Sequence, residues 1–298
     1  MVSRSEPAKR VLVTGGHGFT GRYVCDELAA AGYDVIGTAM SPVPGSVALD
    51  IASPEACRYV IESQRPDYVV HLAAISFVAH ANTDAFYRVN VVGTSNLLQA
   101  CHDADHTPEK ILVASSANVY GNTAGGELRE DQRLQPVNHY GASKAAMEYI
   151  VATWFDKLPV VITRPFNYTG RGQGSQFLVP KIVEHFRQRQ ARIELGNLDV
   201  MRDFSDVRMV AQAYRVLLEG PSAGEIVHIC SGVPYALRDV IKTLEQLAGY
   251  EIEVAVNPAF VRANEVKVLI GSPEKLNRLV PDLIRPAFED TLRWMYEA

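Results

Sequence analysis

Short apolar runs rich in β-branched residues recur along the chain, and stretches of helical pattern separate them. The runs are Val11–Thr14, Asp34–Thr38, Tyr68–Leu72, Ile111–Ala114, Val160–Thr163 and Ile226–Ile229. They do not alternate apolar with polar residues, which is typical of parallel strands covered on both faces. The segments expected to be helical are Tyr23–Ala31, Asp84–His102, Tyr140–Phe155 and Val207–Leu218. The sequence therefore predicts an α/β fold with a Rossmann-type doubly wound parallel sheet, which binds ligands at the carboxyl ends of its strands.

The turn between the first expected strand and the first expected helix is rich in glycine. Val11–Gly21 reads VLVTGGHGFTG, which gives Gly15, Gly18 and Gly21 the spacing G-x-x-G-x-x-G. Such glycines permit a tight turn, let a pyrophosphate approach the backbone and let the helix pack on the strand. The alternative is an ordinary tight turn, but the flanking strand and helix favour dinucleotide binding. The residues expected around the cofactor are Gly15, Gly18, Phe19, Thr20, Gly21, Arg22, Thr38, Asp50, Ile51, Leu72, Ala73, Ala74, Tyr140, Lys144 and Pro165.

The segment after the second expected strand bears on which dinucleotide is bound. NAD-binding folds carry an acid there for the ribose hydroxyls. Gly37–Ser41 reads GTAMS, with neither an acid nor an Arg or Lys. Because no carboxylate would repel a 2′-phosphate, the sequence favours NADP(H), and NAD(H) stays open. Thr38 could hydrogen-bond either species. Asp50 is expected either to contact the adenine or to cap a helix.

The strand and helix pattern changes after Pro165, where glycine and polar residues crowd Tyr168–Gln176 and prolines punctuate the last third of the chain. A chain of 298 residues is long enough for one or two domains. We predict a dinucleotide-binding domain over residues 8–165 plus about 204–250. A smaller, discontinuous α/β lobe that binds the substrate is expected over residues 166–203 plus about 251–298.

Composition excludes several classes of protein. Apolar residues make up 47% of the chain and charged residues 21%, as in soluble globular proteins. The net charge of −5 argues against a broad surface for nucleic acid or anionic membrane. The four cysteines lie far apart without a C-x-x-C pair, so we expect reduced thiols in a cytoplasmic protein and no metal site. The chain shows neither a signal-peptide pattern nor an apolar run long enough to span a membrane.

A Ser, Tyr and Lys constellation points to proton transfer. Tyr140 and Lys144 are four residues apart in an expected helix, so both side chains share one face. A Tyr phenol has a pKa near 10, and a neighbouring ammonium is expected to lower it. The pair could then exchange a proton with a carbonyl or alcohol oxygen. Ile111–Gly121 reads ILVASSANVYG, and Ser116 at the end of that strand could hydrogen-bond the same oxygen.

Five segments together resemble one enzyme family. They occur in the order and at the spacing of the extended short-chain dehydrogenase/reductases that modify nucleotide sugars, and the similarity runs from about residue 9 to 295. The resemblance implies Tyr140 as the acid/base, Lys144 as its electrostatic partner and Ser116 as the third catalytic residue. It also makes Asn90 a support for the backbone rather than a ligand contact. The segments are TGGHGFTG (Thr14–Gly21), HLAA (His71–Ala74), SSANVYG (Ser115–Gly121), YGASK (Tyr140–Lys144) and RPFNYTG (Arg164–Gly170).

One position argues against a dehydratase of this family. Sugar 4,6-dehydratases carry a Glu two residues before the Tyr of the V-Y-G motif, where it serves water elimination as acid and base. This chain has Asn118 there. An amide does not exchange a proton at neutral pH, so elimination lacks its base unless Glu127 or Glu130 reaches the site.

Two later segments resemble the branch of the family that acts on GDP-mannose derivatives. Leu195–Val207 reads LGNLDVMRDFSDV and Arg262–Gly271 reads RANEVKVLIG. The resemblance implies that these segments surround the guanosine diphosphate, with Arg202 on the diphosphate and Glu265 on ribose hydroxyls. The substrate-binding residues expected are Ser76, Ser116, Asn118, Asn167, Val179, Arg202, Arg262 and Glu265.

Two of these assignments have plainer alternatives. Arg202 could form an ion pair within the chain, with Asp203 or Asp206. Glu265 could be a solvated surface acid.

The resemblance implies a reductase that uses NAD(P)H on the C4 ketone of a nucleotide-linked 4-keto-6-deoxy sugar, in particular GDP-4-keto-6-deoxy-D-mannose to GDP-D-rhamnose. The alternative is a nucleotide-sugar 4-epimerase with the same three residues and tightly bound NAD. A cofactor-binding scaffold without catalysis is a third reading, against which the intact Ser116, Tyr140 and Lys144 argue. The family also implies a homodimer formed through two long helices. We expect no nucleic-acid and no membrane partner.

Overall fold

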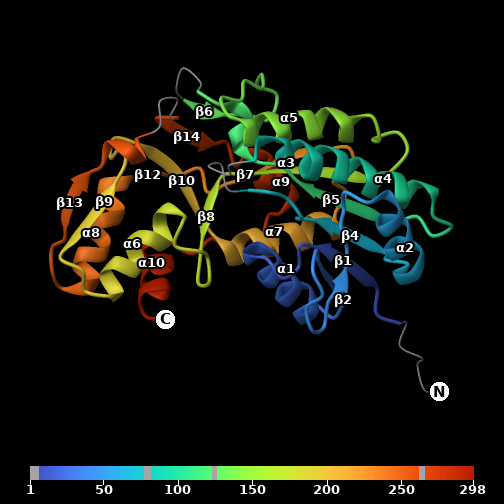
Figure 1. Cartoon of the computed structure of the whole chain (residues 1–298), viewed down its shortest axis with the longest axis horizontal. Helices are drawn as coiled ribbons and strands as arrows, with labels where there is room; N and C mark the ends of the chain where they lie inside the picture. The colour runs from blue at the N-terminus through green and yellow to red at the C-terminus, as the bar shows by residue number, and fades with distance from the viewer. Residues whose placement is uncertain (1–6, 77–81, 123–125, 262–265) are drawn as a thin grey trace. The chain divides into compact units, whose positions relative to one another are not determined.

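The computed structural model describes residues 7–76, 82–122, 126–261 and 266–298 (Figure 1). By their packing, these residues form two compact units, which are described one at a time. The first unit comprises the described residues up to Ser115 together with Ser143–Thr163 and Tyr214–Ile226. The second comprises the described residues of Ser116–Ala142, Arg164–Ala213 and Val227–Ala298.

The main sheet is parallel and, among the described residues, has seven strands in the order β11-β7-β5-β4-β1-β2-β3. All six apolar runs of the sequence are strands of this sheet, so the predicted fold class is confirmed. Because β1 lies between β2 and β4, the winding direction reverses at β1, where open α/β sheets bind ligands. The strands are β1 (Arg10–Thr14), β2 (Asp34–Ala39), β3 (Val47–Ala48), β4 (Tyr68–His71), β5 (Lys110–Ala114), β7 (Val160–Pro165) and β11 (Ile226–Ile229).

Helices cover both faces of this sheet in the first unit (Figure 1). One face packs against α2 (Pro54–Gln64), α4 (Thr94–Asp103) and the later part of α5 (His139–Ala152), through buried residues such as Leu97, Ile111 and Met147. On the other face, α1 (Phe19–Ala30) contacts β1 and β2. A salt bridge of 2.8 Å from Arg215 to Glu27 ties α7 (Val207–Glu219) to α1. Burial of both faces explains why the strands are apolar throughout.

The segment Asp84–His102, expected as one helix, consists of three pieces. A short α3 (Thr83–Tyr87) leads into a π-helix, η1 (Arg88–Gly93), and then into α4. Asn90 in the π-helix is 1% exposed, and its side chain exchanges hydrogen bonds with the backbone of Ile75 at 3.0 and 3.2 Å. Its amide also donates to Oγ of Ser143 on α5 at 3.0 Å. The expectation that Asn90 supports the backbone is confirmed, and these polar partners explain why the regular helix is interrupted.

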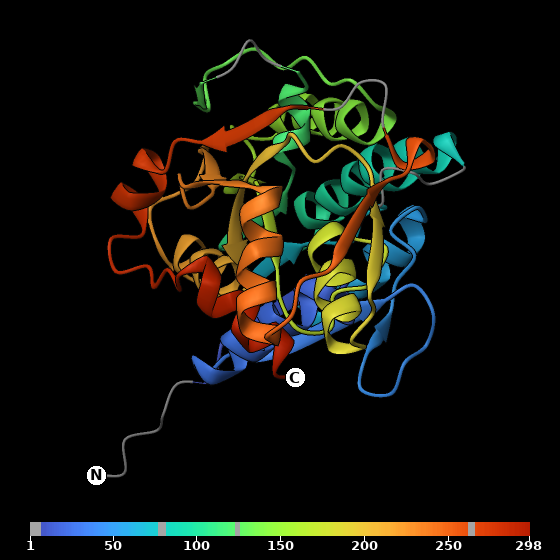
Figure 2. The same ribbon diagram turned by 90° about the vertical axis from the view of Figure 1, so that its left-hand side faces the viewer.

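The second unit contains a mixed sheet and a layer of helices. The sheet has the order β12-β10-β14-β6, and β8 pairs with β10. The unit's helices α6 (Leu178–Arg187), α8 (Leu237–Ala248) and α10 (Phe288–Tyr296) pack on one another, as Figure 2 shows in yellow, orange and red. The other elements are η2 (Ala117–Tyr120), β6 (Glu127–Leu128), β8 (Asn167–Thr169), β9 (Arg192–Leu195), β10 (Met201–Asp206), β12 (Pro234–Ala236), β13 (Glu253–Val256), η3 (Pro258–Phe260), β14 (Val268–Gly271) and α9 (Glu274–Leu279).

The packing of α8 differs from the expected division into domains. From the sequence, residues up to about 250 were assigned to the dinucleotide-binding domain. In the structure, Val240 and Leu244 of α8 are buried together with Phe186 of α6 and Leu292 of α10, in the core of the second unit. The apolar face of α8 explains this, because it must be buried against helices that present apolar faces of their own. The rest of the domain division stays a prediction.

Membrane insertion receives no support from these helices. In the part of the chain that the structure describes, none has both the length and the apolarity that crossing a bilayer requires.

Candidate active site

The glycine-rich turn forms a close-packed cradle in the first unit. Gly15 has a φ of +70°, which favours glycine, and a Cβ at Gly16 would lie only 2.8 Å from Cα of Gly37 on β2. Gly18 is the N-cap of α1 and, being glycine, makes no side-chain cap hydrogen bond. The start of a helix suits a pyrophosphate, because backbone N–H groups and the helix dipole favour an anion there. The turn therefore fits the phosphates of a dinucleotide.

The HLAA segment lies against this turn. The backbone N–H groups of Leu72 and Ala73 both donate to Oγ1 of Thr14 at 3.1 Å. A Cβ at Gly15 would be 3.1 Å from Cα of Ala73, so the two segments touch. His71 bonds Thr14 through Nδ1 at 2.7 Å. The structure thus brings Leu72 and Ala73 to Gly15, where β1 and β4 lie side by side. Their role at a cofactor stays a prediction.

Other expected cofactor residues have structural partners of their own. Thr38 is 2% exposed and its carbonyl accepts from the N–H of Gly16 at 3.1 Å. Oδ1 of Asp50 accepts from the N–H of Ala52 at 2.9 Å, in the turn before α2. The helix-capping alternative is wrong, because Ser53 caps α2. Ile51 is 5% exposed and packs in the core of the first unit. The roles of Thr38, Asp50 and Ile51 at a cofactor stay predictions.

Ser116 begins the 3-10 helix η2 in the second unit. Its backbone is extended and its Oγ caps the helix, accepting the N–H of Asn118 at 3.2 Å. Nδ2 of Asn118 donates to the same Oγ at 3.1 Å. The side chains of Ser116 and Asn118 are therefore bonded to each other.

The start of α5 comes unusually close to η2. A Cβ at Gly141 would lie 2.6 Å from the backbone oxygen of Asn118, so only glycine permits this approach. The next residue back, Tyr140, is 8% exposed and hydrogen-bonds the Ser116 hydroxyl. The glycine between Tyr140 and Lys144 in the YGASK motif thus has a steric reason. The structure brings Ser116, Asn118 and Tyr140 together.

Burial controls the acidity of Tyr140. It raises the pKa of this phenol to about 12, while the hydrogen bond from Ser116 works in the opposite direction. The expectation of a lowered pKa is therefore wrong, because burial, the largest cause, raises it. Like an ordinary phenol, Tyr140 is protonated at neutral pH and so has a proton to donate.

Lys144 lies one turn after Tyr140 on α5, in the part of that helix that belongs to the first unit. Its Nζ donates to the carbonyl of Ala114, at the end of β5, at 2.7 Å. Burial lowers the pKa of Lys144 to about 8, and the charge of Glu148 opposes that shift. Glu148 is itself held by Oγ of Ser115 at 2.5 Å. Lys144 is thus fixed in place with its charge partly stabilised.

A buried network behind η2 was not indicated by the sequence. The Tyr120 hydroxyl lies 2.5 Å from Nε2 of His228 and accepts from Nη1 of Arg164, also at 2.5 Å. Burial lowers the pKa of His228 to about 3, so this ring is neutral. Tyr120 and His228 are separated by 108 residues, so no local pattern could have paired them.

The two acids considered for water elimination have other surroundings. Oε1 of Glu130 accepts from the N–H of His228 at 3.0 Å, and its carbonyl accepts from Nη1 of Arg164 at 2.8 Å. Glu127 is an exposed residue of β6, paired with Ile270 of β14. Both residues are part of the framework of the second unit.

Arg202 and its acidic neighbours have separate partners. Nη1 of Arg202 donates to the carbonyls of Met201 and Lys267 at 3.0 and 3.1 Å. The Asp203 carboxylate accepts from both N–H and Oγ of Ser231 and from the N–H groups of Gly232 and Gly271, the last at 3.4 Å.

Asp206 forms a salt bridge of 2.6 Å with Arg208. Asp206 thus pairs with Arg208, whereas the contacts given for Asp203 are hydrogen bonds.

The remaining expected substrate residues differ in their surroundings. Nδ2 of Asn167 is buried and, among the described residues, has no hydrogen-bond partner, which fits a group that receives a ligand oxygen. Val179 is 2% exposed in the core of the second unit. Ser76 is exposed. Arg262 and Glu265 lie outside the described residues.

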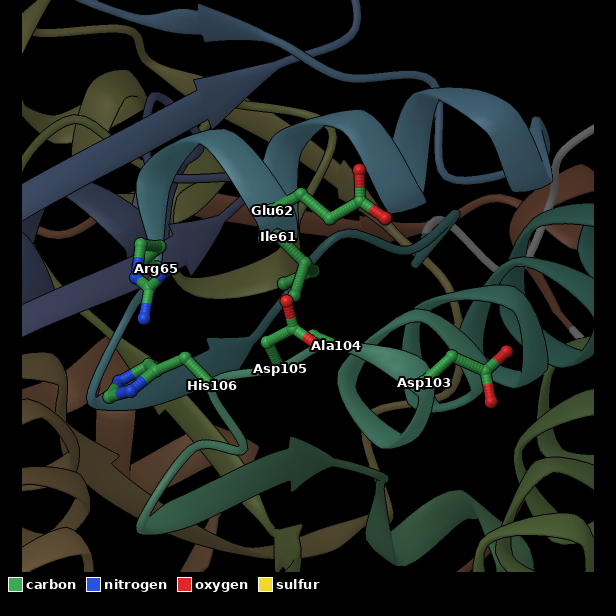
Figure 3. Close-up of a pocket in the computed structure, with 7 residues that line it drawn as sticks. All are labelled: Ile61, Glu62, Arg65, Asp103, Ala104, Asp105 and His106. Atoms are coloured by element: carbon green, nitrogen blue, oxygen red, sulfur yellow. The ribbon is translucent and has the colours of Figure 1, made fainter.

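A small pocket elsewhere in the first unit holds none of the expected site residues. It has a volume of about 110 Å³ and lies between the end of α2 and the end of α4 (Figure 3). Most of its lining is charged, with Glu62, Arg65, Asp103 and Asp105. In the described parts of the chain, no group of three or more His, Cys, Asp or Glu residues is placed to hold a metal ion.

A doubly wound sheet with a phosphate cradle, followed by a Tyr and Lys on one helix, defines an enzyme of the short-chain dehydrogenase/reductase class. The pattern of the NAD dependent epimerase/dehydratase family matches residues 11–230. The chain belongs to this family.

Two relatives have similar sequences over nearly their whole length. The GDP-6-deoxy-D-talose 4-dehydrogenase of Aggregatibacter actinomycetemcomitans is 36% identical over 270 residues, 90% of each chain. The GDP-6-deoxy-D-mannose reductase of Pseudomonas aeruginosa is 34% identical over 280 residues, also 90% of each chain.

Two solved structures have the same fold. One, from Burkholderia cenocepacia J2315 and provisionally described as an epimerase, has a TM-score of 0.92 and 48% identity over 98% of each chain. The other, RMD from Pseudomonas aeruginosa complexed with NADPH, has a TM-score of 0.87 and 30% identity. It covers 97% of this chain and 98% of its own.

Proposed function

We propose that this enzyme uses NAD(P)H to reduce the C4 ketone of a GDP-linked 4-keto-6-deoxy sugar. The substrate proposed is GDP-4-keto-6-deoxy-D-mannose, and the product is GDP-D-rhamnose, which is GDP-6-deoxy-D-mannose. The observation that carries the proposal is the buried contact between Ser116 and Tyr140, which are 6% and 8% exposed. A protonated phenol is what the reduction of a ketone requires, because the product oxygen must gain a proton.

The names of the two relatives support the choice of substrate. Both are enzymes of GDP-linked 6-deoxyhexoses, one named for position 4 and the other for reduction. Reduction of the same 4-keto compound gives the talose or the mannose configuration, according to the face that receives the hydride. The mannose configuration is proposed here because the segments around Arg202 and Arg262 resemble the GDP-mannose branch.

In the proposed mechanism, the cofactor supplies a hydride when it is bound. Tyr140 donates its proton to the oxygen that becomes an alkoxide as the ketone is reduced. Ser116 stabilises the charge that develops at the proton donor, and Lys144 favours the phenolate that remains. Burial of Tyr140 and Lys144, at 8% and 4% exposure, excludes water and strengthens these interactions.

The substrate is proposed to bind residues of the second unit. Arg202 would hold the diphosphate, and Asn167 a phosphate or sugar oxygen through its Nδ2, which has no hydrogen-bond partner in the described parts of the chain. Arg262 and Glu265 are proposed for the nucleoside on resemblance alone.

NADP(H) is the proposed cofactor, with NAD(H) as the alternative. The cradle at Gly15, Gly16 and Gly18 suits the pyrophosphate of either. Met40, directly after β2, is 77% exposed and stands where NAD-binding folds carry an acid. The solved reductase-like neighbour was determined with NADPH.

A cytoplasmic homodimer is the proposed form. Val92 of η1 and Tyr149 and Ile150 of α5 are apolar and exposed, at 49%, 67% and 37%. Their helices are neighbours in the first unit, since Asn90 of η1 bonds Ser143 of α5. Exposed apolar side chains on two adjacent helices suit a partner of the same kind. The four free cysteines fit a reducing compartment.

A nucleotide-sugar 4-epimerase is the second candidate, because the Burkholderia structure is described as that of an epimerase. Such an enzyme would oxidise C4, let the keto sugar rotate so that its other face meets the cofactor, and return the hydride. It would therefore consume no cofactor. Tight co-purification of NAD would favour it.

The deciding experiment follows the absorbance of NADPH after addition of GDP-4-keto-6-deoxy-D-mannose. We expect one NADPH to be consumed per ketone, with GDP-D-rhamnose identified by NMR, and no turnover in Tyr140→Phe. The variant should still bind NADPH. Inversion of a GDP-hexose at C4 without NADPH consumption would replace the proposal by the epimerase.

A further inference from the structure

We infer that Asn118 is a positioning residue that fixes the direction of the Ser116–Tyr140 hydrogen bond: it occupies the acceptor sites of the Ser116 oxygen, so that the Ser116 hydroxyl donates to Tyr140. This inference rests on the proposed function and gives Asn118 a specific part in it. Asn118 then influences the substrate through Ser116 and Tyr140.

The count of donors and acceptors at Ser116 is the first step. A serine hydroxyl has one proton to donate and two lone pairs that accept. Asn118 supplies two donors to this oxygen, its backbone N at 3.2 Å and its Nδ2 at 3.1 Å. Ser116 is 6% exposed, so its remaining bond is made with protein or substrate rather than with bulk water. With both lone pairs occupied, Ser116 can only donate.

The partner of that donated proton is Tyr140. Tyr140 hydrogen-bonds Ser116. Because Asn118 donates twice to the Ser116 oxygen, Ser116 is the donor in that bond. Because the phenolic oxygen accepts from Ser116, the phenol's own proton points to another acceptor. That proton is the one that the ketone oxygen needs.

The resulting step balances. A new C–H bond forms from the cofactor's hydride, and the π electrons of the C4 carbonyl move to its oxygen. That oxygen takes the Tyr140 proton, so one O–H bond breaks and another forms. The phenolate that remains keeps the hydrogen bond from Ser116 until water returns a proton. If Ser116 instead accepted from Tyr140, the phenol's proton would point away from the substrate.

The backbone holds Asn118 in place for this task. Its carbonyl accepts from the N–H of Gly121 at 3.3 Å, which closes the turn of η2. The same carbonyl is where α5 approaches closest, at Gly141. A side chain at position 118 therefore has a fixed origin relative to both Ser116 and Tyr140.

A double-mutant cycle tests the inference. Asn118→Ala removes Nδ2 but leaves the backbone donor, and we expect kcat to fall about tenfold with KM changed little, the effect of one hydrogen bond to a charged group. Asn118→Asp keeps the size of the side chain, but its carboxylate can only accept. It should therefore accept the hydrogen bond of the Ser116 hydroxyl in place of Tyr140 and lower kcat further. In a Ser116→Ala background, Asn118→Ala should lower kcat no further. NADPH affinity and the circular dichroism spectrum, measured for every variant, control for folding.

Multiplicative losses in the double variant, or a higher KM with kcat unchanged, would overturn the inference in favour of direct substrate binding. A second readout needs no substrate. In protein labelled with ¹³Cζ-tyrosine, the Tyr140 resonance is assigned by its absence in Tyr140→Phe. It should move in the same direction in Ser116→Ala and Asn118→Ala. An unmoved resonance in Asn118→Ala refutes the inference, whichever sugar the enzyme reduces or epimerises. A moved resonance without NADPH consumption refutes only the proposed function.

Discussion

Glu148 lies one helical turn after Lys144 on α5, and both ionisable side chains are 4% exposed. The acid supports the ammonium, because its charge raises the pKa of Lys144 against the larger lowering by burial. His71 also faces this ammonium, whose charge adds to the lowering of the pKa of His71. The charge state of Lys144 near neutral pH therefore depends on its neighbour.

Replacing Glu148 by Gln should shift the loss of activity on the basic side of the pH profile to a lower pH. The pKa of Lys144 is about 8, so activity that needs the ammonium is lost as the pH rises through that value. Without the carboxylate the pKa falls further, and the basic limb of the kcat profile should move down by about one pH unit. Glu62→Gln, on the exposed face of α2, is the control. An unchanged profile in Glu148→Gln would show that Glu148 does not maintain that charge.

Acid should destabilise the fold through two buried histidines. Burial lowers the pKa of both His71 and His228 to about 3. Between the unfolded value of about 6.5 and pH 3, the unfolded chain binds more protons, so stability falls as the pH falls. Each histidine contributes at most about 1.4 kcal/mol per pH unit.

Urea unfolding at several pH values measures this effect. His228→Gln should flatten the loss of unfolding free energy between about pH 6.5 and pH 4, relative to its own value at pH 7. The control His17→Gln, at an exposed position, should leave this loss of unfolding free energy unchanged. An equal slope in His228→Gln and the native chain would mean that His228 does not stay neutral in the fold.

An acid after β2 should reverse the choice of cofactor. Met40→Asp places a carboxylate where a 2′-phosphate is proposed, and the repulsion should weaken NADPH binding by about tenfold, with NADH affected less. Met40→Asn is the isosteric control without charge. Fluorescence titration with each reduced cofactor gives the dissociation constants. Equal weakening of both cofactors by Met40→Asp would argue that no 2′ group lies near this residue.

A charge on α5 should separate the proposed dimer. Tyr149 is 67% exposed, and Tyr149→Lys would place an ammonium in an apolar contact between copies. Gel filtration with light scattering should then give the monomer mass. Tyr59→Lys is a matched control, since Tyr59 on α2 is 71% exposed. A native chain that is already monomeric, or a Tyr149→Lys dimer, contradicts the prediction.

Features encoded in consecutive residues were predictable. Six of the seven described strands of the main sheet follow from apolar runs, and the glycine cradle from three glycines between a strand and a helix. The motifs predict that Ser116 and Tyr140 reach one substrate oxygen, but not that the two residues bond to each other. The pKa of Tyr140 was not predictable either, because burial depends on the whole surrounding structure. The π-helix escaped prediction for a similar reason, since Asn90 interrupts the helix through partners at Ile75 and Ser143, distant in the sequence.

The second unit was less predictable because long-range pairs define it. The strands β6, β8 and β12 are two or three residues long, too short for any periodicity to be seen. Asp203 illustrates the same limit. The sequence indicates only the preceding Arg202 as a partner for its carboxylate, whereas the fold brings Ser231 and Gly232 to it.

The Asp203 carboxylate also limits how the sugar selectivity of a relative can be transferred to this enzyme by exchanging segments. Asp203 fastens the turn at Ser231 and Gly232 and the end of β14 at Gly271 to the middle of β10. These segments come from three separate stretches of the sequence. A loop exchanged alone would therefore lose its hydrogen bonds to the Asp203 carboxylate. Grafts that alter sugar selectivity in this unit should therefore carry all three stretches as a single block.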